Sequence, residues 1–342
     1  MDLTLDFIRK VVFSLTNQFL FTFLIFERKS RVNLGMINLI DKFEHLTSHA
    51  TESEIKAIIP AEDIEKLYND MAECLDDIIE LLRETKNIYK FIKDKGINRV
   101  IETNLQIKNT KLRIRFIVIL KILFTKAPTS TKANIPHNIV DDLLDMFERD
   151  DNLAIKAHVL DVLNIWLPET PKIQARVMEI KGLEPFYDQV AKLDTNVIKT
   201  LLGLFNKILN EHLRERNTKI QSSKADLDKL RLYQKIGLIE RMSTPTVCNG
   251  LLNIFEIMWN VSTDDNKAIF NVFELIKNVK PFCISIFRGK AKAKELFNKL
   301  SEYVNDQDNL HLLEKYLNLT DVNLVVSGYL REIRSGTMKD EF

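Results

Sequence analysis

A helical pattern that recurs after 42 to 44 residues is the feature of this sequence that most limits its fold. Residues 171–212 predict a short helix that ends at Gly182, a second short helix, a turn at Asp194-Thr195 and a long helix. Matching second helices begin 42 and 44 residues apart, at Ile97, Ile139 and Leu183. None of these helices can bury its apolar face alone, so copies of the unit must stack on one another.

The repeat length and the composition together predict the fold class. A period of this size lies in the range of armadillo and HEAT repeats. The chain of 342 residues contains only 9 Gly and 8 Pro, which indicates few turns and long periodic segments. We therefore predict an all-α, armadillo-like helical repeat solenoid, wound as a right-handed superhelix, with helical caps at both ends.

The same patterns predict the organisation of the chain. We expect an apolar N-terminal segment (1–35), N-terminal helices and a cap (36–86), three armadillo-like repeats (87–213), a polar loop (214–229), degenerate C-terminal repeats with a cap (230–335) and a polar tail (336–342). Within this scheme we expect a short helix over 36–43 followed by a polar segment to Pro60, and single helices over 230–242, 264–277 and 309–317. Repeat two is expected to begin at Pro128.

The N-terminal segment differs from the rest of the chain. Arg9 and Lys10 precede the apolar run 11–26, which resembles the core of a signal peptide or signal anchor. Asn17 and Gln18 interrupt the run, and it is short for a membrane span. The alternative is an amphipathic helix that packs on the solenoid.

Charge and cysteine usage exclude several classes of protein. With 49 basic and 48 acidic residues, the whole chain has no net attraction for nucleic acid or membranes. Cys74, Cys248 and Cys283 are too far apart for a zinc site and too few for a disulfide scaffold. Whether Cys248 pairs with Cys283 stays open at this point.

The sequence contains no recognisable motif for catalysis or for nucleotide binding. The histidines are scattered, and only His45 and His49 share a helical face, without cysteine or carboxylate support nearby. Adjacent acidic pairs such as Asp141-Asp142 diverge on a helix and cannot act together as acid and base. We therefore predict a protein without enzymatic activity, metal or cofactor.

A basic stretch follows the first expected repeat helices. No acidic residue lies between Glu102 and Asp141. Seven positive charges lie there: Lys108, Lys111, Arg113, Arg115, Lys121, Lys126 and Lys132. Nucleic-acid binding is disfavoured because exposed aromatic residues do not alternate with these charges. The stretch is then either a solvated helix face or a docking surface for an acidic protein.

The C-terminus and two sequons point to the lumen of the endoplasmic reticulum (ER). The final residues Lys339-Asp340-Glu341-Phe342 differ from the retrieval signal K-D-E-L only in the last position. Asn260 and Asn318 each begin an N-glycosylation sequon. These features predict an ER-lumenal glycoprotein.

Four segments together resemble one family. In chain order they are MINLIDKF, KNIYKFIKDKGINRVI, PKIQARVMEIKGLEPF and, after the polar stretch, LDKLRLYQKIGLI. Their order and spacing over residues 36–245 resemble the nucleotide exchange factors of heat-shock protein 70 chaperones, and most closely the ER-lumenal SIL or BiP-associated-protein branch. Two features depart from that pattern: Pro136-His137-Asn138 stands where a glycine is expected, and the export signal is poorly formed.

The resemblance implies a co-chaperone that assists protein folding and translocation in the ER. Its concave face would bind the ATPase domain of BiP and hold one lobe away from the other, so that ADP leaves. The implied protein is a monomer that forms a 1:1 complex with BiP, uses no nucleic acid, and is not inserted in a membrane once the signal is cleaved.

The family pattern also implies a set of contact residues on the long third helices. Equivalent positions fall at Val118, Asp161 and Gly203 and, one turn on, at Ile122, Ile165 and Lys207. The flanking residues are Lys111, Arg115, Asn164, Lys199 and Asn206. Val118, Ile122 and Ile165 have an alternative role as core residues between helices.

Two other functions are compatible with the sequence. Translation from Met36 would give a cytosolic exchange factor that lacks the apolar run. A general armadillo adaptor for extended peptides is less favoured, because such adaptors present tryptophan and asparagine ladders that these positions do not hold.

Overall fold

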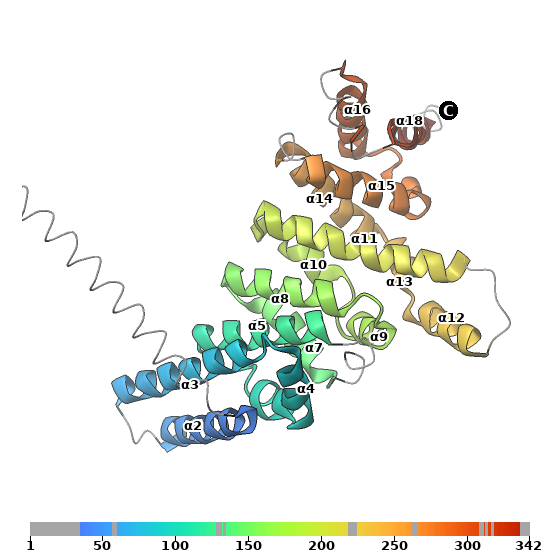
Figure 1. The fold of residues 1–342 in the computed structure, drawn as a ribbon. Helices are drawn as coiled ribbons and strands as arrows, with labels where there is room; N and C mark the ends of the chain where they lie inside the picture. The colour runs from blue at the N-terminus through green and yellow to red at the C-terminus, as the bar shows by residue number, and fades with distance from the viewer. Residues whose placement is uncertain are drawn as a thin grey trace, which may run out of the picture. The chain divides into compact units, whose positions relative to one another are not determined.

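The structure, a computed structural model, describes residues 35–56, 60–127, 132, 135–217, 224–261, 266–307, 311, 314–315 and 318–335. Every regular element in these residues is a helix, which confirms the all-α prediction for them. The chain divides into two compact units, Met1–Ala127 and Pro128–Phe342. In each unit the helices pack against their neighbours, as Figure 1 shows, in a manner compatible with a helical repeat solenoid.

The first unit contains five described helices. They are α2 (Met36–Lys56), α3 (Ala61–Leu81), α4 (Thr85–Lys93), the π-helix η1 (Ile97–Glu102) and α5 (Thr110–Lys126). Helix α2 packs against α3, α4 and η1, while α3 and α4 pack against α5. In the core of the unit, the rings of Phe43 on α2 and Phe116 on α5 pack edge to face, with their centroids 5.8 Å apart.

Helix α2 is longer than the sequence predicted. The expected helix over 36–43 continues to Lys56, through residues that the sequence indicated as a polar segment. Ala50 and Ser53 extend the buried stripe that runs from Met36 to Phe43, although most of the intervening side chains are polar. The hydroxyls of Thr47 and Ser53 each donate to a carbonyl one turn earlier, so these side chains are accommodated inside the helix.

The boundary between α4 and η1 lies where the sequence predicted it. A Cβ atom at Gly96 would lie 2.5 Å from the ring of Phe91, so only glycine allows η1 to follow α4 this closely. The second helix that the sequence predicted to begin at Ile97 is the π-helix over 97–102.

The second unit contains the remaining helices. Its larger elements are α7 (Asn138–Arg149), α8 (Leu153–Trp166), α9 (Pro171–Ile180), α10 (Glu184–Gln189), α11 (Thr195–Asn217), α12 (Lys224–Ile236), α14 (Pro245–Val261), α15 (Asn266–Phe287), α16 (Ala291–Asn305) and α18 (Leu319–Ser335). Two short elements, η2 (Val190–Lys192) and α13 (Leu238–Met242), join larger ones. The long helices α8, α11, α15 and α18 pack side by side in this order (Figure 1). We call them the third-helix row.

Helices α9, α10 and α11 occupy the stretch 171–212, where the sequence predicted two short helices and a long one. Pro171 occupies the first turn of α9, where its missing N–H costs nothing. Gly182 ends this helix with a φ of 70°, a conformation that favours glycine. The Asp194 carboxylate accepts hydrogen bonds from the backbone N–H groups of Asn196 and Val197 and so caps α11.

The polar loop predicted over 214–229 is largely helical. Helix α11 continues to Asn217, and α12 begins at Lys224. Ion pairs hold these polar turns: Arg216 pairs with Glu240 at 2.7 Å, and Lys229 pairs with Glu215 at 2.9 Å. In the described parts of this segment, 214–217 and 224–229, the polar composition therefore marks solvated helix surface.

The C-terminal repeats are more regular than the sequence predicted. Helices α12, α14 and α15 pack on α9, α10 and α11 respectively, an arrangement compatible with a fourth repeat. The single helix expected over 230–242 is broken at Gly237, whose φ is 67°, into α12 and α13. The helix expected over 264–277 runs instead through Pro281 to Phe287, because Cys283 and Phe287 are buried and hold its last turns in place. The expected helix over 309–317 falls mostly outside the described residues.

A buried polar cluster joins α9, α11 and α12. The Glu211 carboxylate accepts hydrogen bonds from the Glu169 backbone N–H at 2.9 Å, from the Gln174 amide at 3.2 Å and from the Tyr233 hydroxyl. His212 is fully buried, and its Nε2 lies 2.8 Å from the Gln174 side-chain oxygen. The other ring nitrogen, Nδ1, has no hydrogen-bond partner among the described residues. The cluster thus requires a neutral His212.

This arrangement predicts an acid-sensitive second unit. Burial, assisted by the charge of Arg216, lowers the pKa of His212 from 6.5 to about 4. The unfolded state therefore binds more protons than the folded state between these values, and stability is lost as pH falls through this window. We expect the free energy of unfolding to fall by about 1 kcal/mol between pH 7.5 and pH 5.5, and by roughly 3 kcal/mol over the whole window.

Urea unfolding followed by tryptophan fluorescence measures this effect, because both tryptophans, Trp166 and Trp259, lie in the second unit. In His212→Gln the part of the pH dependence that is due to this imidazole should disappear. An identical pH dependence in the wild type and the variant would contradict the assignment.

Candidate functional site

The third-helix row of the second unit carries most of the predicted contact residues. Asp161, Asn164 and Ile165 lie on α8, and all three are partly exposed. Lys199, Gly203 and Lys207 lie on α11, where Lys207 is exposed and the other two are partly exposed. The Lys207 ammonium donates to the Asn164 side-chain oxygen at 3.0 Å. The structure thus brings the two helices' predicted residues together on one face.

Gly203 leaves an open space on this face. A Cβ atom built at Gly203 would have no atom within 4 Å. The glycine is therefore not required for close packing of helices, unlike Gly96 in the first unit. A side chain of a partner protein has room to approach the backbone of α11 here.

Asn206 has a structural role that the sequence did not predict. It is 8% exposed, and its amide donates to the Asn271 carbonyl on α15 at 2.9 Å. Its side-chain oxygen is buried without a partner in the described residues. Asn206 therefore joins α11 to α15 and offers little surface to a partner.

The predicted contact residues of the first unit all lie on α5. Lys111 is exposed, and Val118 and Ile122 are partly exposed, so neither apolar residue is a fully buried core residue. The Arg115 guanidinium forms two hydrogen bonds to the Asp76 carboxylate on α3, at 3.0 and 2.9 Å. Such a bidentate pair fixes Arg115 to α3 and limits its reach toward a partner.

Sequence reasoning missed the continuation of the third-helix row onto α15 and α18. The Asn278 amide on α15 donates to the Asn210 side-chain oxygen on α11 at 2.9 Å. Lys277, also on α15, pairs with Asp321 on α18. The sequence signal was hidden because 71 residues, instead of 42, separate the starts of α11 and α15.

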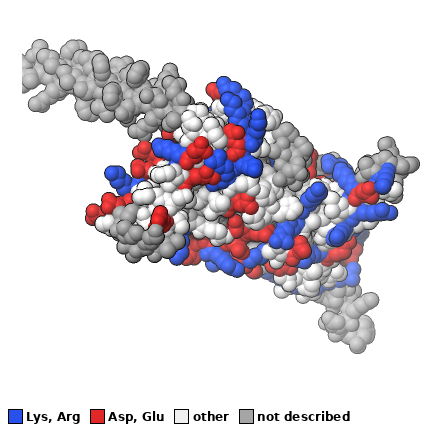
Figure 2. Space-filling model, turned by 90° about the horizontal axis from the view of Figure 1, so that it is seen from below, with Lys and Arg blue, Asp and Glu red and all other residues white. Residues whose placement is uncertain are grey.

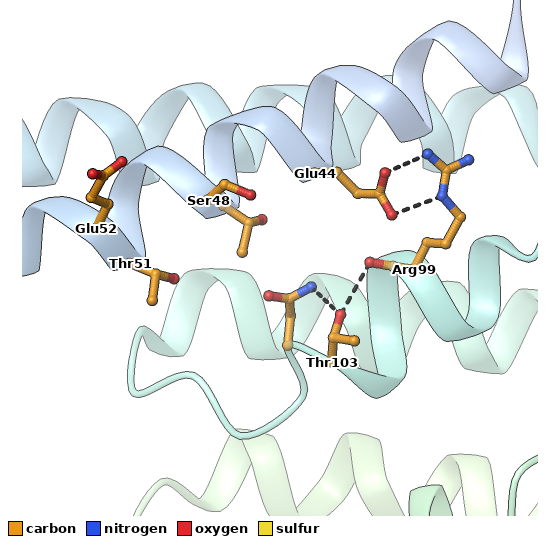
Figure 3. Close-up of a pocket in the computed structure, with 8 residues that line it drawn as sticks. Glu44, Ser48, Thr51, Glu52, Arg99 and Thr103 are labelled. Atoms are coloured by element: carbon orange, nitrogen blue, oxygen red, sulfur yellow. Dashed lines mark hydrogen bonds and ion pairs between the residues drawn. The ribbon is translucent and has the colours of Figure 1, made fainter. Parts of the chain in front are cut away.

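A polar groove with a volume of about 640 Å³ lies between α2 and η1 in the first unit. Figure 3 shows Glu44 and Arg99 paired at one end of the groove, and Thr51 and Glu52 at the other. Arg99 also pairs with Asp41 at 2.6 Å, and its hydrogen bond lowers the pKa of Glu44. Because two carboxylates hold Arg99, this residue is not available to an anionic ligand, and it fastens η1 to α2.

The other two cavities described are small. One, of about 90 Å³, lies between α15 and α18, and one of about 20 Å³ lies beside His212. Pockets for small molecules usually have volumes of roughly 300–1,000 Å³. Neither cavity therefore fits a metabolite.

The described part of the chain offers neither a metal site nor a membrane span. It contains no group of three or more His, Cys, Asp or Glu side chains arranged to hold a metal ion. Across the same residues, no helix combines the length and the hydrophobicity that crossing a bilayer requires.

The structure pairs the two cysteines that the sequence left open. Cys248 on α14 and Cys283 on α15 form a disulfide, with Cα atoms 5.4 Å apart. Cys74 is a buried free thiol, and burial raises its pKa to about 11, which makes it unreactive.

The predicted modification and targeting residues are only partly described. Asn318 is exposed before α18, and its side-chain oxygen accepts a hydrogen bond from the Asp321 backbone N–H at 3.3 Å. Its amide nitrogen, the atom that would carry a glycan, therefore stays free of this cap. The side chain of Asn260, the apolar segment 1–34, Pro128 and the tail residues Lys339, Asp340, Glu341 and Phe342 lie outside the described residues.

No protein-family model matches the chain, and no curated protein shows significant similarity to it.

Proposed function

We propose that this protein is a nucleotide exchange factor for BiP, the heat-shock protein 70 chaperone of the ER. In this proposal its helices form an armadillo-like, right-handed superhelix that binds the BiP ATPase domain and promotes release of ADP. The protein itself catalyses no covalent step.

One observation carries the proposal. Apart from the buried Asn206, the residues implied by the family resemblance on α8 and α11 lie on one exposed or partly exposed face, where Lys207 and Asn164 are in direct contact. This face mixes charged, amide and apolar groups and is not hollowed into a metabolite pocket. Such a surface suits a folded protein partner better than a small substrate.

The mechanism that follows is a shift between two states of the chaperone. ADP binds tightly when both lobes of the ATPase domain close around it. A protein that binds the open state better than the closed state weakens the binding of ADP. By the same factor, bound ADP weakens the binding of that protein. A coupling of 1–3 kcal/mol is typical, which corresponds to an affinity change of roughly 5- to 150-fold.

The disulfide supports the ER lumen as the location. Disulfides persist in oxidising compartments and are rare in the cytosol. Cys248 and Cys283 are both fully buried in the second unit, so the bridge forms part of its core. The exposed sequon at Asn318 agrees with the same compartment.

Release of labelled ADP from purified BiP tests the proposal. We expect the wild-type protein to accelerate release. Lys111→Glu and Lys207→Glu should each slow the accelerated rate by about tenfold, because each replaces a positive charge by a negative one at a proposed contact residue of its unit. Lys294→Glu, on the exposed side of α16, is the matched control and should keep full activity.

Arg115 requires a separate control, because its charge reversal would break the pair with Asp76. Arg115→Glu alone could lose activity because the broken pair destabilises the fold. The double variant Arg115→Glu/Asp76→Lys restores an ion pair, so a loss of activity in a folded double variant would assign Arg115 to the contact with BiP. Wild-type protein that leaves ADP release from BiP unchanged would refute the proposed function.

A further inference from the structure

Helix α4 carries a basic face that the proposed contact residues do not include. Lys86, Tyr89, Lys90 and Lys93 are all exposed and recur at spacings of three and four, so they lie along one side of the helix. The opposite side, with Asn87, Ile88 and Phe91, is buried. No acidic residue occurs in α4 itself, although Glu84 and Asp94 flank its two ends.

Tyr89 lies in the middle of this face and is 53% exposed. Packing a partner's apolar side chain on this exposed ring would remove apolar surface from water. Tyrosine is also enriched among the residues that dominate the binding energy of protein interfaces. The ring is flanked by lysines along the helix, so the face combines an apolar centre with a positive rim.

The lysines of α4 are weakly neutralised. Lys86 pairs with Glu84 at 2.7 Å, but both side chains are more than half exposed, so water screens this pair. Within the described residues, Lys90 and Lys93 form no ion pair. Their charges are therefore available to a partner.

The corresponding first helices of later repeats differ from α4. On α9, Arg176 is held by Asp141 at 2.8 Å, and Glu179 adds a negative charge. On α12, Asp228 lies beside Lys229 and Arg231 on the exposed surface. The uniform positive face of α4 is thus not a general property of first helices in this chain.

We propose that the exposed face of α4 binds an acidic polypeptide segment of a partner protein. Carboxylates of the segment would pair with Lys90 and Lys93, and an apolar or aromatic side chain would pack on Tyr89. This surface is separate from the third-helix positions, and the inference does not depend on the exchange activity.

Charge and size favour an acidic peptide over nucleic acid and over an anionic membrane as the partner of α4. Figure 2 shows one face of the protein, on which basic side chains gather in groups with acidic side chains beside them. Nucleic acid requires a longer basic track with several stacking aromatics, whereas α4 is nine residues long and exposes one. A membrane requires apolar side chains that enter the lipid, and the exposed face has no aliphatic residue.

Binding of a fluorescein-labelled peptide of ten glutamates and one central phenylalanine tests this inference at low salt. We expect the wild-type protein to bind it, Lys90→Glu/Lys93→Glu to weaken binding by at least tenfold, and Tyr89→Ala to weaken it by about fivefold. Lys172→Glu on α9 changes an equally exposed first-helix lysine and should leave the affinity unchanged. Thermal unfolding of each variant shows whether its fold is retained.

Three results would overturn the inference. The first is absence of peptide binding by the wild-type protein. The second is an equal loss in Lys172→Glu, which would show a diffuse charge effect. The third is stronger, Lys90- and Lys93-dependent binding to phosphatidylserine vesicles or to a single-stranded oligonucleotide.

Discussion

Replacement of Glu211 by alanine is expected to lower the free energy of unfolding of the second unit by about 3–5 kcal/mol. The carboxylate is 5% exposed and accepts hydrogen bonds from Tyr233, Gln174 and the backbone of Glu169. Without it, the buried Tyr233 hydroxyl loses its acceptor, and the Gln174 amide and the Glu169 backbone N–H each lose one hydrogen bond. The cost of leaving buried groups unpaired dominates the loss, and the removed contacts themselves contribute less.

Urea unfolding at neutral pH, followed by tryptophan fluorescence, measures this change in the second unit. Glu240→Ala is the matched control, because this carboxylate is 60% exposed in its pair with Arg216 and should cost no more than about 1 kcal/mol. In a double-mutant cycle, Tyr233→Phe should cost less in the Glu211→Ala background than in the wild type. Equal costs of Glu211→Ala and Glu240→Ala would show that the buried cluster does not stabilise the unit.

Removal of the disulfide is expected to have an effect of similar size. The bridge between Cys248 and Cys283 closes a segment with a sequence separation of 35 residues. The loop-entropy relation gives about 4 kcal/mol of stabilisation for a loop of this length. Because the bridge links α14 to α15 in the core of the second unit, its loss should weaken the packing of these two helices first.

The double variant Cys248→Ser/Cys283→Ser, compared with the wild type under oxidising and reducing conditions, measures the contribution of the bridge. Reductant should lower the urea midpoint of the wild-type protein and leave the double variant unchanged. Cys74→Ser controls for the third cysteine, which is buried and free. A wild-type midpoint that is unaffected by complete reduction would contradict the prediction.

The repeat pattern predicted the helices of the middle of the chain well. Gly182 follows the end of α9 with a positive φ, as the sequence predicted, and η1 begins at the predicted Ile97, directly after Gly96, where a Cβ atom would meet the ring of Phe91. The expected positions on α8 and α11 meet on one face because the 43-residue offset between Asn164 and Lys207 equals one repeat.

The C-terminal half was predicted less well because local signals conflicted with packing. Pro281 is a helix breaker by local rules, yet α15 continues past it because its last turns are buried. The last turn of α11 has the composition of a loop, but ion pairs such as Arg216–Glu240 stabilise it as helix. These long-range contacts leave no periodic trace in the sequence.

The sequence by itself determined the all-helical class, the repeat length and the third-helix positions, because these depend on periodicity and on glycine and proline placement. Only the tertiary structure decided which polar residues are held inside the protein. Arg115 is held by Asp76, Asn206 by Asn271 and Glu211 by Tyr233, each through contacts between residues 22 to 65 positions apart. A charge or an amide has the same appearance in a sequence whether its partner is water, a distant side chain or another protein.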